Sequence, residues 1–231
     1  MNLLDALGAA LRLLATGDRE LWGIVSISLK VSLMGLAIAT PPSVIIGYLL
    51  ATKRFRGRRA LVVLLQSMLA FPTVVVGLVL YMLLSRQGPF GSLQLLFTQD
   101  AMILGQAILA FPILAAFTVS AVQGADPRAH ETAVSLGAGP WRAALTTLNE
   151  VRFGVMAAVI NGFGRAISEV GCALMIGGNI AGVTRNITTA IALETSKGEF
   201  VQGIALGVVL VALALGVNFV MAMLQGEGGM K

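Results

Sequence analysis

The chain has 231 residues, of which 57% are hydrophobic and 12% are charged, and its mean hydropathy is +0.88. Soluble domains are roughly 45–50% apolar, so this composition excludes an ordinary soluble fold and predicts an all-α integral membrane protein. The net charge of +5 does not indicate a nucleic-acid partner, because the positive residues lie between apolar stretches instead of along a solvated face. The single cysteine, Cys172, and single histidine, His130, exclude an internal disulfide and a Cys/His metal cluster.

Residues 1–20 are expected to form an N-terminal interfacial segment. Their leucines recur at helical spacing, at Leu3, Leu4, Leu7, Leu11 and Leu14. No basic region precedes these leucines, as it would in a cleaved signal peptide. The pattern therefore predicts a short helix lying on the membrane surface.

A transmembrane domain is predicted over residues 21–224, followed by a short C-terminal tail at 225–231. Crossing the hydrocarbon core takes about 20 mostly apolar residues. Five stretches meet this requirement: 22–51, 60–84, 102–123, 154–178 and 201–224. The sequence therefore predicts about five transmembrane helices.

Proline lies inside each of the first three predicted spans, at Pro41 and Pro42, at Pro72 and at Pro112. Because proline removes a backbone donor, we expect helix kinks at these positions. The tetrapeptide Leu-Ala-Phe-Pro occurs at residues 69–72 and again at 109–112. We interpret the two copies as similar kinks, with internal duplication as the alternative.

The distribution of basic residues predicts the orientation. Residues 52–59 read TKRFRGRR, with five basic residues in eight, so this connection is expected in the cytoplasm. By alternation, the N-terminus and the loops near 85–101 and 179–200 lie outside, whereas the loop at 124–153 and the C-terminus lie inside. Lysines and arginines then number nine inside and five outside, which supports this orientation.

The inside loop at 124–153 is too long for a simple turn between membrane helices. Asp126 followed by Pro127 is typical of a helix start, and Gly137 with Gly139 would end that helix. A second short helix is expected from Pro140. The loop therefore predicts a surface helix-turn-helix that displays side chains to a partner. The residues it would display include Glu131, Leu136 and Trp141.

Within this loop, Glu131-Thr132-Ala133 followed by Gly137 resembles the Glu-Ala-Ala, three residues, Gly signature of permease subunits of bacterial ATP-binding-cassette (ABC) importers. The resemblance implies a coupling helix that docks on a separate ATPase subunit. The ATPase-coupling residues would be Glu131, Thr132, Ala133, Leu136, Gly137 and Trp141. The sequence departs from the signature at Thr132, where alanine is usual, and at Asn149-Glu150, where Leu-Pro is frequent. The alternative is an ordinary amphipathic loop.

The fourth predicted span contains polar residues at helical spacing: Asn161, Arg165, Ser168, Glu169 and Cys172. We expect them along one helical face that is turned to the bundle interior. Arg165 and Glu169 are four residues apart, and they either form a structural ion pair or line a translocation pathway for an anion. Lys30 in the first span is interpreted as extending to the membrane surface.

A glycine-rich segment at 177–185 follows this span. Its backbone amides, with Asn179 and Thr184, could bind an oxyanion, although a plain loop explains the same composition. The run from Phe163 to Glu199 resembles permeases of molybdate and tungstate importers, and Thr188-Thr189-Ala190 and the residues up to Thr195 are closest to the tungstate branch. The resemblance covers residues 20–224.

This resemblance implies a type I ABC importer (MetI-like) permease fold in a bacterial cytoplasmic (inner) membrane. It implies a homodimer that works with two copies of a cytoplasmic ATPase and with an extracytoplasmic oxyanion-binding protein. ATP and Mg would bind the ATPase, so no cofactor, metal or catalytic residue is expected in this chain. The pathway residues predicted from the polar face and the glycine-rich segment are Asn161, Arg165, Ser168, Glu169 and Asn179.

The sequence contains no phosphate-binding loop, no Gly-x-Ser-x-Gly elbow and no His-Glu-x-x-His pair. The predicted function is the membrane-spanning subunit of an ATP-driven tungstate importer. The alternatives are a molybdate or sulfate importer, a secondary transporter or channel, and a membrane-embedded enzyme using Ser168 beside Glu169.

Overall fold

The computed structural model describes residue 8, residue 12 and residues 17–225, so most of the predicted interfacial helix lies outside the described residues. The described elements are α2 (Arg19–Thr52), α3 (Arg58–Met68), α4 (Thr73–Leu84), the 3₁₀ helix η1 (Gly91–Leu93), α5 (Gln99–Gln123), α6 (Pro127–Ser135), α7 (Pro140–Glu150), α8 (Arg152–Ile167), α9 (Gly171–Gly177), α10 (Ile187–Lys197) and α11 (Phe200–Gln225). The all-α class predicted from composition is therefore confirmed over this part of the chain.

Helices α2 and α5 form the centre of the bundle and run parallel. A Cβ on Gly35 would lie 2.6 Å from the Cβ of Gln106, and a Cβ on Gly47 would lie 2.7 Å from that of Thr118, so the contacts advance equally along both helices. Only glycine permits so close an approach of the two backbones. Because parallel helices must start on the same side, the chain between them returns across the bundle.

That return is made by a bent pair of helices, α3 and α4, instead of the single predicted span at 60–84. Their axes differ by 100°, and the break lies at residues 69–72, with Pro72 as the N-cap of α4. The expected kink at Pro72 is therefore a complete interruption. In contrast, Pro41, Pro42 and Pro112 lie inside continuous helices.

The predicted fourth span at 154–178 is also interrupted. Helix α8 ends at Ile167 and α9 begins at Gly171, while α7 and α8 form a second bent pair at 68°. Among the described residues, three helices are long and apolar enough to cross a membrane, and five crossings result if each bent pair counts as one. The 16 residues of α8 extend about 24 Å, less than the hydrocarbon thickness of about 30 Å.

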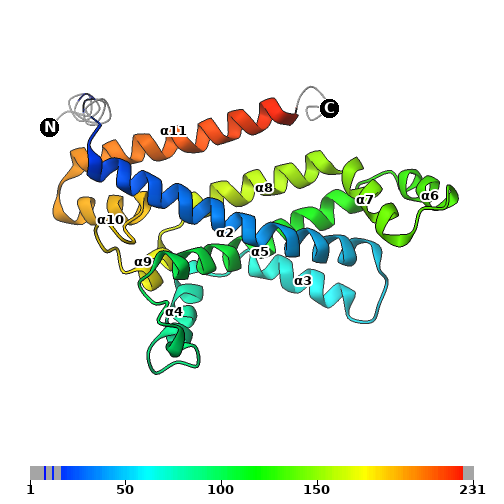
Figure 1. The fold of residues 1–231 in the computed structure, drawn as a ribbon, viewed down its shortest axis with the longest axis horizontal. Helices are drawn as coiled ribbons and strands as arrows, with labels where there is room; N and C mark the ends of the chain where they lie inside the picture. The colour runs from blue at the N-terminus through cyan, green and yellow to red at the C-terminus, as the bar shows by residue number, and fades with distance from the viewer. Residues whose placement is uncertain (1–7, 9–11, 13–16, 226–231) are drawn as a thin grey trace.

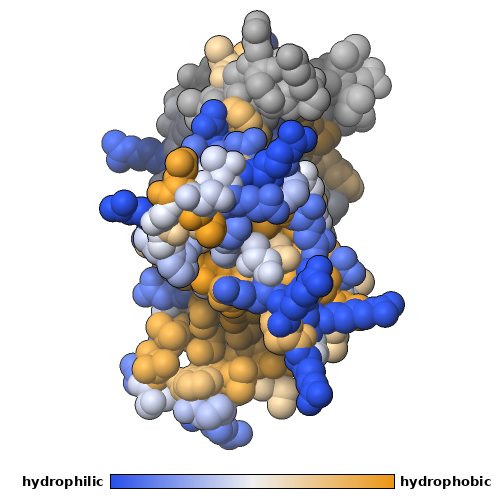
Figure 2. All heavy atoms as spheres, turned by 90° about the vertical axis from the view of Figure 1, so that its right-hand side faces the viewer, coloured by the Kyte–Doolittle hydropathy of each residue, from blue (hydrophilic) through white to orange (hydrophobic). Residues whose placement is uncertain are grey.

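Most of the connections predicted on each side of the membrane lie at opposite ends of the molecule, whereas the one between α4 and α5 lies at its lower edge (Figure 1). The α2–α3 turn, the α6–α7 hairpin and the end of α11 lie at one end, and α9, α10 and the start of α11 lie at the other. Figure 2 looks onto the hairpin end, where hydrophilic side chains project and hydrophobic ones are exposed between them. Which end faces the cytoplasm stays a prediction.

Candidate functional site

The predicted helix-turn-helix is present as α6 and α7. The Asp126 carboxylate accepts a hydrogen bond from the Arg128 backbone N–H over 2.9 Å, and Pro127 is the first residue of α6. Pro140 likewise begins α7. The His130 ring and the Thr147 hydroxyl are 3.2 Å apart and join the two helices. The local signals at the start of each helix therefore predicted it correctly.

Gly137 ends α6 in a left-handed conformation with φ +83°. Its N–H donates to the carbonyl of Val134, and the Ala138 N–H donates to the carbonyl of Ala133, which is the Schellman pattern of helix termination. A Cβ on Gly137 would meet no atom within 4 Å, so the requirement for glycine is conformational. Gly139 has an extended backbone with φ −66° and carries no such requirement.

The hairpin exposes large apolar side chains. Leu136 is 83% exposed and Trp141 is 70% exposed, far more than buried packing residues would be. Glu131 and Thr132 are also exposed, and Ala133 is half-buried. A groove runs along this surface, lined by Arg128, Ala129, Thr132, Ala133, Leu136, Ala138, Arg142 and Thr146. An exposed apolar surface of this kind suits docking of another protein.

The second site lies at the break between α8 and α9. Asn161, Arg165 and Ser168 are exposed at spacings of four and three residues, so they share one side of α8. The helix stops at Ile167, and Glu169 and Cys172 are buried, so the expected single face through Cys172 is wrong. A side chain at the break provides a hydrogen bond to the end of α8: the Ser168 hydroxyl donates to the backbone carbonyl of Gly164 over 2.7 Å.

Arg165 and Glu169 face each other across this break in unequal surroundings. The Arg165 Nη2 atom lies 4.0 Å from Glu169 Oε2, and the two side chains are 48% and 3% exposed. The other carboxylate oxygen, Oε1, accepts the Cys172 backbone N–H over 3.0 Å and so caps α9. Glu169 is thus held by the helix start, and the Arg165 guanidinium remains half accessible.

Helices α4 and α10, both longer than α9, also begin beside this break. A Cβ on Gly171 would lie 3.1 Å from Thr73 Oγ1 and 3.2 Å from the Val74 backbone N, in the first turn of α4. The Thr188 hydroxyl, in the first turn of α10, donates to the Glu169 backbone carbonyl over 2.7 Å. Helix N-termini carry partial positive charge, so the break lies in a region that favours an anion.

Asn179 lies at the far end of α9, in a left-handed conformation with φ +52°. Among the described residues, no hydrogen bond or ion pair joins it to the other four predicted pathway residues. Its loop is organised by Thr184, whose hydroxyl donates to the carbonyl of Gly177 and accepts the Ile180 N–H. This loop is a defined turn beyond α9.

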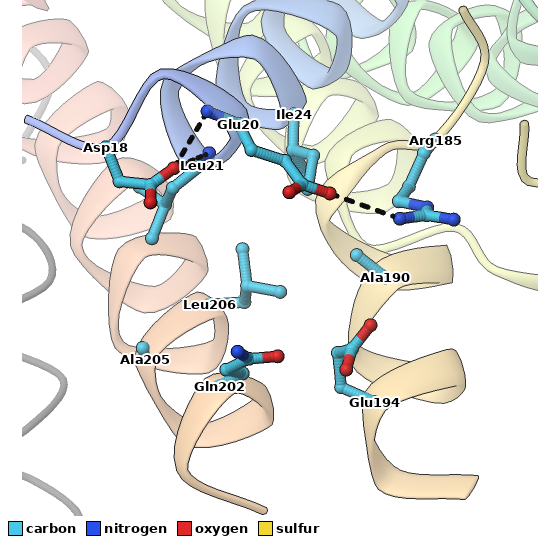
Figure 3. A pocket seen from close by; sticks show the side chains of 10 residues that line it. All are labelled: Asp18, Glu20, Leu21, Ile24, Arg185, Ala190, Glu194, Gln202, Ala205 and Leu206. Carbon is cyan, nitrogen blue, oxygen red and sulfur yellow. Dashed lines mark hydrogen bonds and ion pairs between the residues drawn. The ribbon is translucent and has the colours of Figure 1, made fainter. Parts of the chain in front are cut away.

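Figure 3 shows a pocket at the end of the molecule remote from the hairpin, between α2, α10 and α11. The Glu20 carboxylate lies 3.4 Å from the Arg185 guanidinium, and Asp18 caps α2 through the N–H groups of Glu20 and Leu21. The pocket contains none of the predicted site residues. The Glu20–Arg185 ion pair joins the first turn of α2 to the segment that precedes α10.

Sequence reasoning missed the role of Thr188 and Asn186 at the break. Asn186 and Thr189 form a capping box at the start of α10, and the Thr188 hydroxyl also contacts the Asn186 side chain over 3.0 Å. An asparagine three residues before a threonine at a loop end is a recognisable helix-start signal. This signal predicts the start of α10, but it does not predict the contact between Thr188 and Glu169.

Comparison with known proteins identifies the family. The model of the family described as "Binding-protein-dependent transport system inner membrane component" matches residues 43–226, which is more than half of the chain. A "Probable anion ABC transporter permease protein" of Haloferax volcanii is 42% identical over 212 residues, covering 88% of this chain and 91% of the relative.

Two further relatives carry named substrates. The "Tungstate uptake system permease protein TupB" of Peptoclostridium acidaminophilum is 38% identical and covers 95% of this chain and 96% of its own. The "Molybdenum transport system permease protein ModB" of Escherichia coli strain K12 is 31% identical and covers 84% of this chain and 89% of its own. Both similarities extend over nearly the whole chain.

Among solved structures, a bacterial alginate ABC transporter in complex with alginate-bound periplasmic protein aligns with a TM-score of 0.73. The match covers 94% of this chain and 83% of that one at 17% identity, so it shows the fold alone. Membership of a transport family decides against a membrane-embedded enzyme and against a secondary transporter or channel. The chain belongs to the binding-protein-dependent transport system inner membrane component family and is a permease subunit of an ABC importer.

Proposed function

We propose that this chain is the membrane-spanning subunit of an ATP-driven importer for a tetrahedral oxyanion, with tungstate as the preferred substrate. The observation that carries the proposal is the half-exposed Arg165 guanidinium at the break between α8 and α9. A cation within a membrane-spanning segment is costly to insert, and it usually marks a pathway for a charged substrate. Molybdate and sulfate are the alternative substrates.

The electrostatics of the break support an anion as cargo. The nearby carboxylate of Glu169 is buried and its Oε1 accepts the hydrogen bond that caps α9, so it reduces the positive potential without covering Arg165. The first turns of α4 and α10 add partial positive charge. Asn161 and Ser168 supply polar side chains on the same side of α8. Asn179 would contact the anion earlier, at the outer loop.

The choice of tungstate rests on the relatives. Two tungstate uptake permeases are 38% identical to this chain, whereas the molybdenum permeases are 31% identical or less and the sulfate permeases are 24% to 25% identical. Tungstate and molybdate have the same charge and tetrahedral shape, so the extracytoplasmic oxyanion-binding protein would make most of the distinction.

Coupling to ATP would occur at the α6–α7 hairpin. In this proposal the chain forms a homodimer, and each hairpin docks on one of two cytoplasmic ATPase subunits that bind ATP and Mg. Leu136 and Trp141 supply the exposed apolar contact, and the exposed Glu131 supplies a charge on the same hairpin, where it also lines a pocket with Arg54 and Arg58. The hairpin and the basic α2–α3 turn share one end of the molecule, which supports a cytoplasmic C-terminus and an external N-terminus.

The interrupted helices provide the moving parts. Closure of the ATPase dimer would bring the two hairpins together, and α7 would transmit this displacement to α8 through their 68° bend. The breaks at 69–72 and 168–170 allow α4 and α9 to shift relative to α3 and α8. The oxyanion released by the binding protein would then pass along the Arg165 side of α8.

Reconstitution tests the proposal. The chain is placed in liposomes with its ATPase and binding protein, and uptake of labelled tungstate is measured with and without internal ATP. We expect uptake that requires both partners and ATP, with competition by molybdate stronger than by sulfate. Uptake that proceeds without the ATPase contradicts the proposed mechanism, and preferential competition by sulfate contradicts the substrate.

The coupling role has its own variant. Glu131→Lys reverses an exposed charge on the α6–α7 hairpin and should leave ATP hydrolysis by the assembled complex poorly coupled to uptake. Glu150→Lys makes the same change at the exposed end of α7 and serves as the control, because a cation is favourable at a helix C-terminus. If Glu131→Lys supports normal uptake per ATP, the hairpin does not couple through this residue.

A further inference from the structure

The α2–α3 turn concentrates positive charge at the end of two apolar helices. Five cations lie in this turn and in the first two residues of α3: Lys53, Arg54, Arg56, Arg58 and Arg59. Within residues 17–225, none of them lies in an ion pair, and all except the half-buried Arg58 are exposed. Clustered cations repel one another, so the turn favours an anionic neighbour.

The five cations divide between two sides of the turn. Arg54 and Arg58 line a pocket against the α6–α7 hairpin, where they share the space with Asp126, His130 and Glu131. The Arg58 guanidinium also donates to the backbone carbonyls of Leu50 and Ala51 at the end of α2, which fixes the turn. These two arginines therefore face the protein.

Lys53, Arg56 and Arg59 lie outside that pocket, and an exposed aromatic ring accompanies them. Phe55 is 47% exposed within the most basic stretch of the chain. Beyond the turn, α3 exposes an apolar flank through Leu61, Val63 and Leu64, which are 45%, 52% and 52% exposed. Cations followed by exposed apolar residues match the order of headgroup and acyl chain in a lipid leaflet.

We propose that Lys53, Arg56 and Arg59 form a binding site for the headgroups of anionic phospholipids, with Phe55 inserted among the adjoining acyl chains. Lysine and arginine near a membrane surface each strengthen attraction to anionic lipid by about fivefold in affinity. Arg58 joins this turn to the end of α2 and also lines the pocket beside α6. Lipid bound at the turn would therefore fix the start of the α6–α7 hairpin at one distance from the membrane surface.

The test measures lipid binding by the full-length chain in a non-ionic detergent. The probes are short-chain phosphatidylglycerol, which is anionic, and short-chain phosphatidylcholine, which carries no net charge. Lys53→Gln, Arg56→Gln and Arg59→Gln are combined in one variant. The matched control combines Arg128→Gln, Arg142→Gln and Arg152→Gln, which remove the same charge from exposed positions on the α6–α7 hairpin and the start of α8.

We expect the turn variant to bind phosphatidylglycerol at least tenfold more weakly while the control changes by less than twofold. Phe55→Ser should weaken binding of both lipids, because the ring contributes through apolar contact. Equal loss in the turn variant and the control overturns the site, as does unchanged affinity in the turn variant. Full competition by millimolar inorganic phosphate overturns a lipid ligand and indicates a site for free anions.

Discussion

The Thr188 hydroxyl donates a hydrogen bond of 2.7 Å to the backbone carbonyl of Glu169, 19 residues earlier in the chain. Thr188 lies in the first turn of α10, and Glu169 lies where α8 has ended and α9 has not begun. Both residues are buried. In lipid, an interrupted helix is stable only if other groups bind its free carbonyls, so this bond holds the break in place.

Removing the Thr188 hydroxyl should destabilise the break. Thr188→Val keeps the shape of the side chain but leaves the buried Glu169 carbonyl without its partner, at a cost of about 1–3 kcal/mol. We expect a lower midpoint of thermal unfolding in detergent and reduced tungstate uptake. Thr188→Ser retains the hydroxyl and should preserve most of both. Equal behaviour of the valine and serine variants would show that the bond contributes nothing measurable.

The two charges at the break should affect the affinity for tungstate in opposite directions. Arg165→Gln removes the cation and should lower uptake at least tenfold without weakening association with the ATPase. Glu169→Gln keeps an oxygen to accept the Cys172 N–H but removes the negative charge next to Arg165, so it should lower the KM for tungstate and also lower kcat. Uptake kinetics in liposomes measure both changes. A pair that is purely structural would instead give reduced protein stability with an unchanged KM.

Two neighbouring glycines in the hairpin should respond differently to alanine. Gly137→Ala places a Cβ on a residue with φ +83°, at a cost of about 1–2 kcal/mol, and should distort the end of α6. Gly139→Ala should be tolerated, since its φ is −66° and no atom lies within 4 Å of the added carbon. Co-purification with the ATPase and ATP-driven uptake compare the two. Similar losses in both variants would contradict the conformational explanation.

The close contact of α2 and α5 should depend on Gly47. In Gly47→Ala the new Cβ would lie 2.7 Å from the Cβ of Thr118 and 2.8 Å from the carbonyl oxygen of Ala115, so the helices must separate. Overpacking of this kind costs about 1–3 kcal/mol. Gly23→Ala, on the exposed side of the same helix, meets no atom within 4 Å and is the control. We expect a lower unfolding temperature only for Gly47→Ala.

The sequence by itself determined the features that depend on neighbouring residues or on composition. Hydropathy identified the apolar segments that cross the bundle, although two of them prove to be bent or broken. The α6–α7 hairpin followed from Asp126, Pro127, Gly137 and Pro140, because each acts on backbone groups within a few residues of itself. The clustering of five cations at 53–59 was equally evident, since charge needs no fold to be counted.

Only the tertiary structure decided where the helices break. The tetrapeptide Leu-Ala-Phe-Pro separates helices α3 and α4 at 69–72, but at 109–112 it lies within the continuous helix α5. The prediction of two similar kinks is therefore wrong. At the break after Ile167, the Thr188 hydroxyl of α10 binds the backbone carbonyl of Glu169. Proline and glycine permit an interruption, but the groups that stabilise a break come from distant parts of the chain, so the local sequence does not reveal which site breaks.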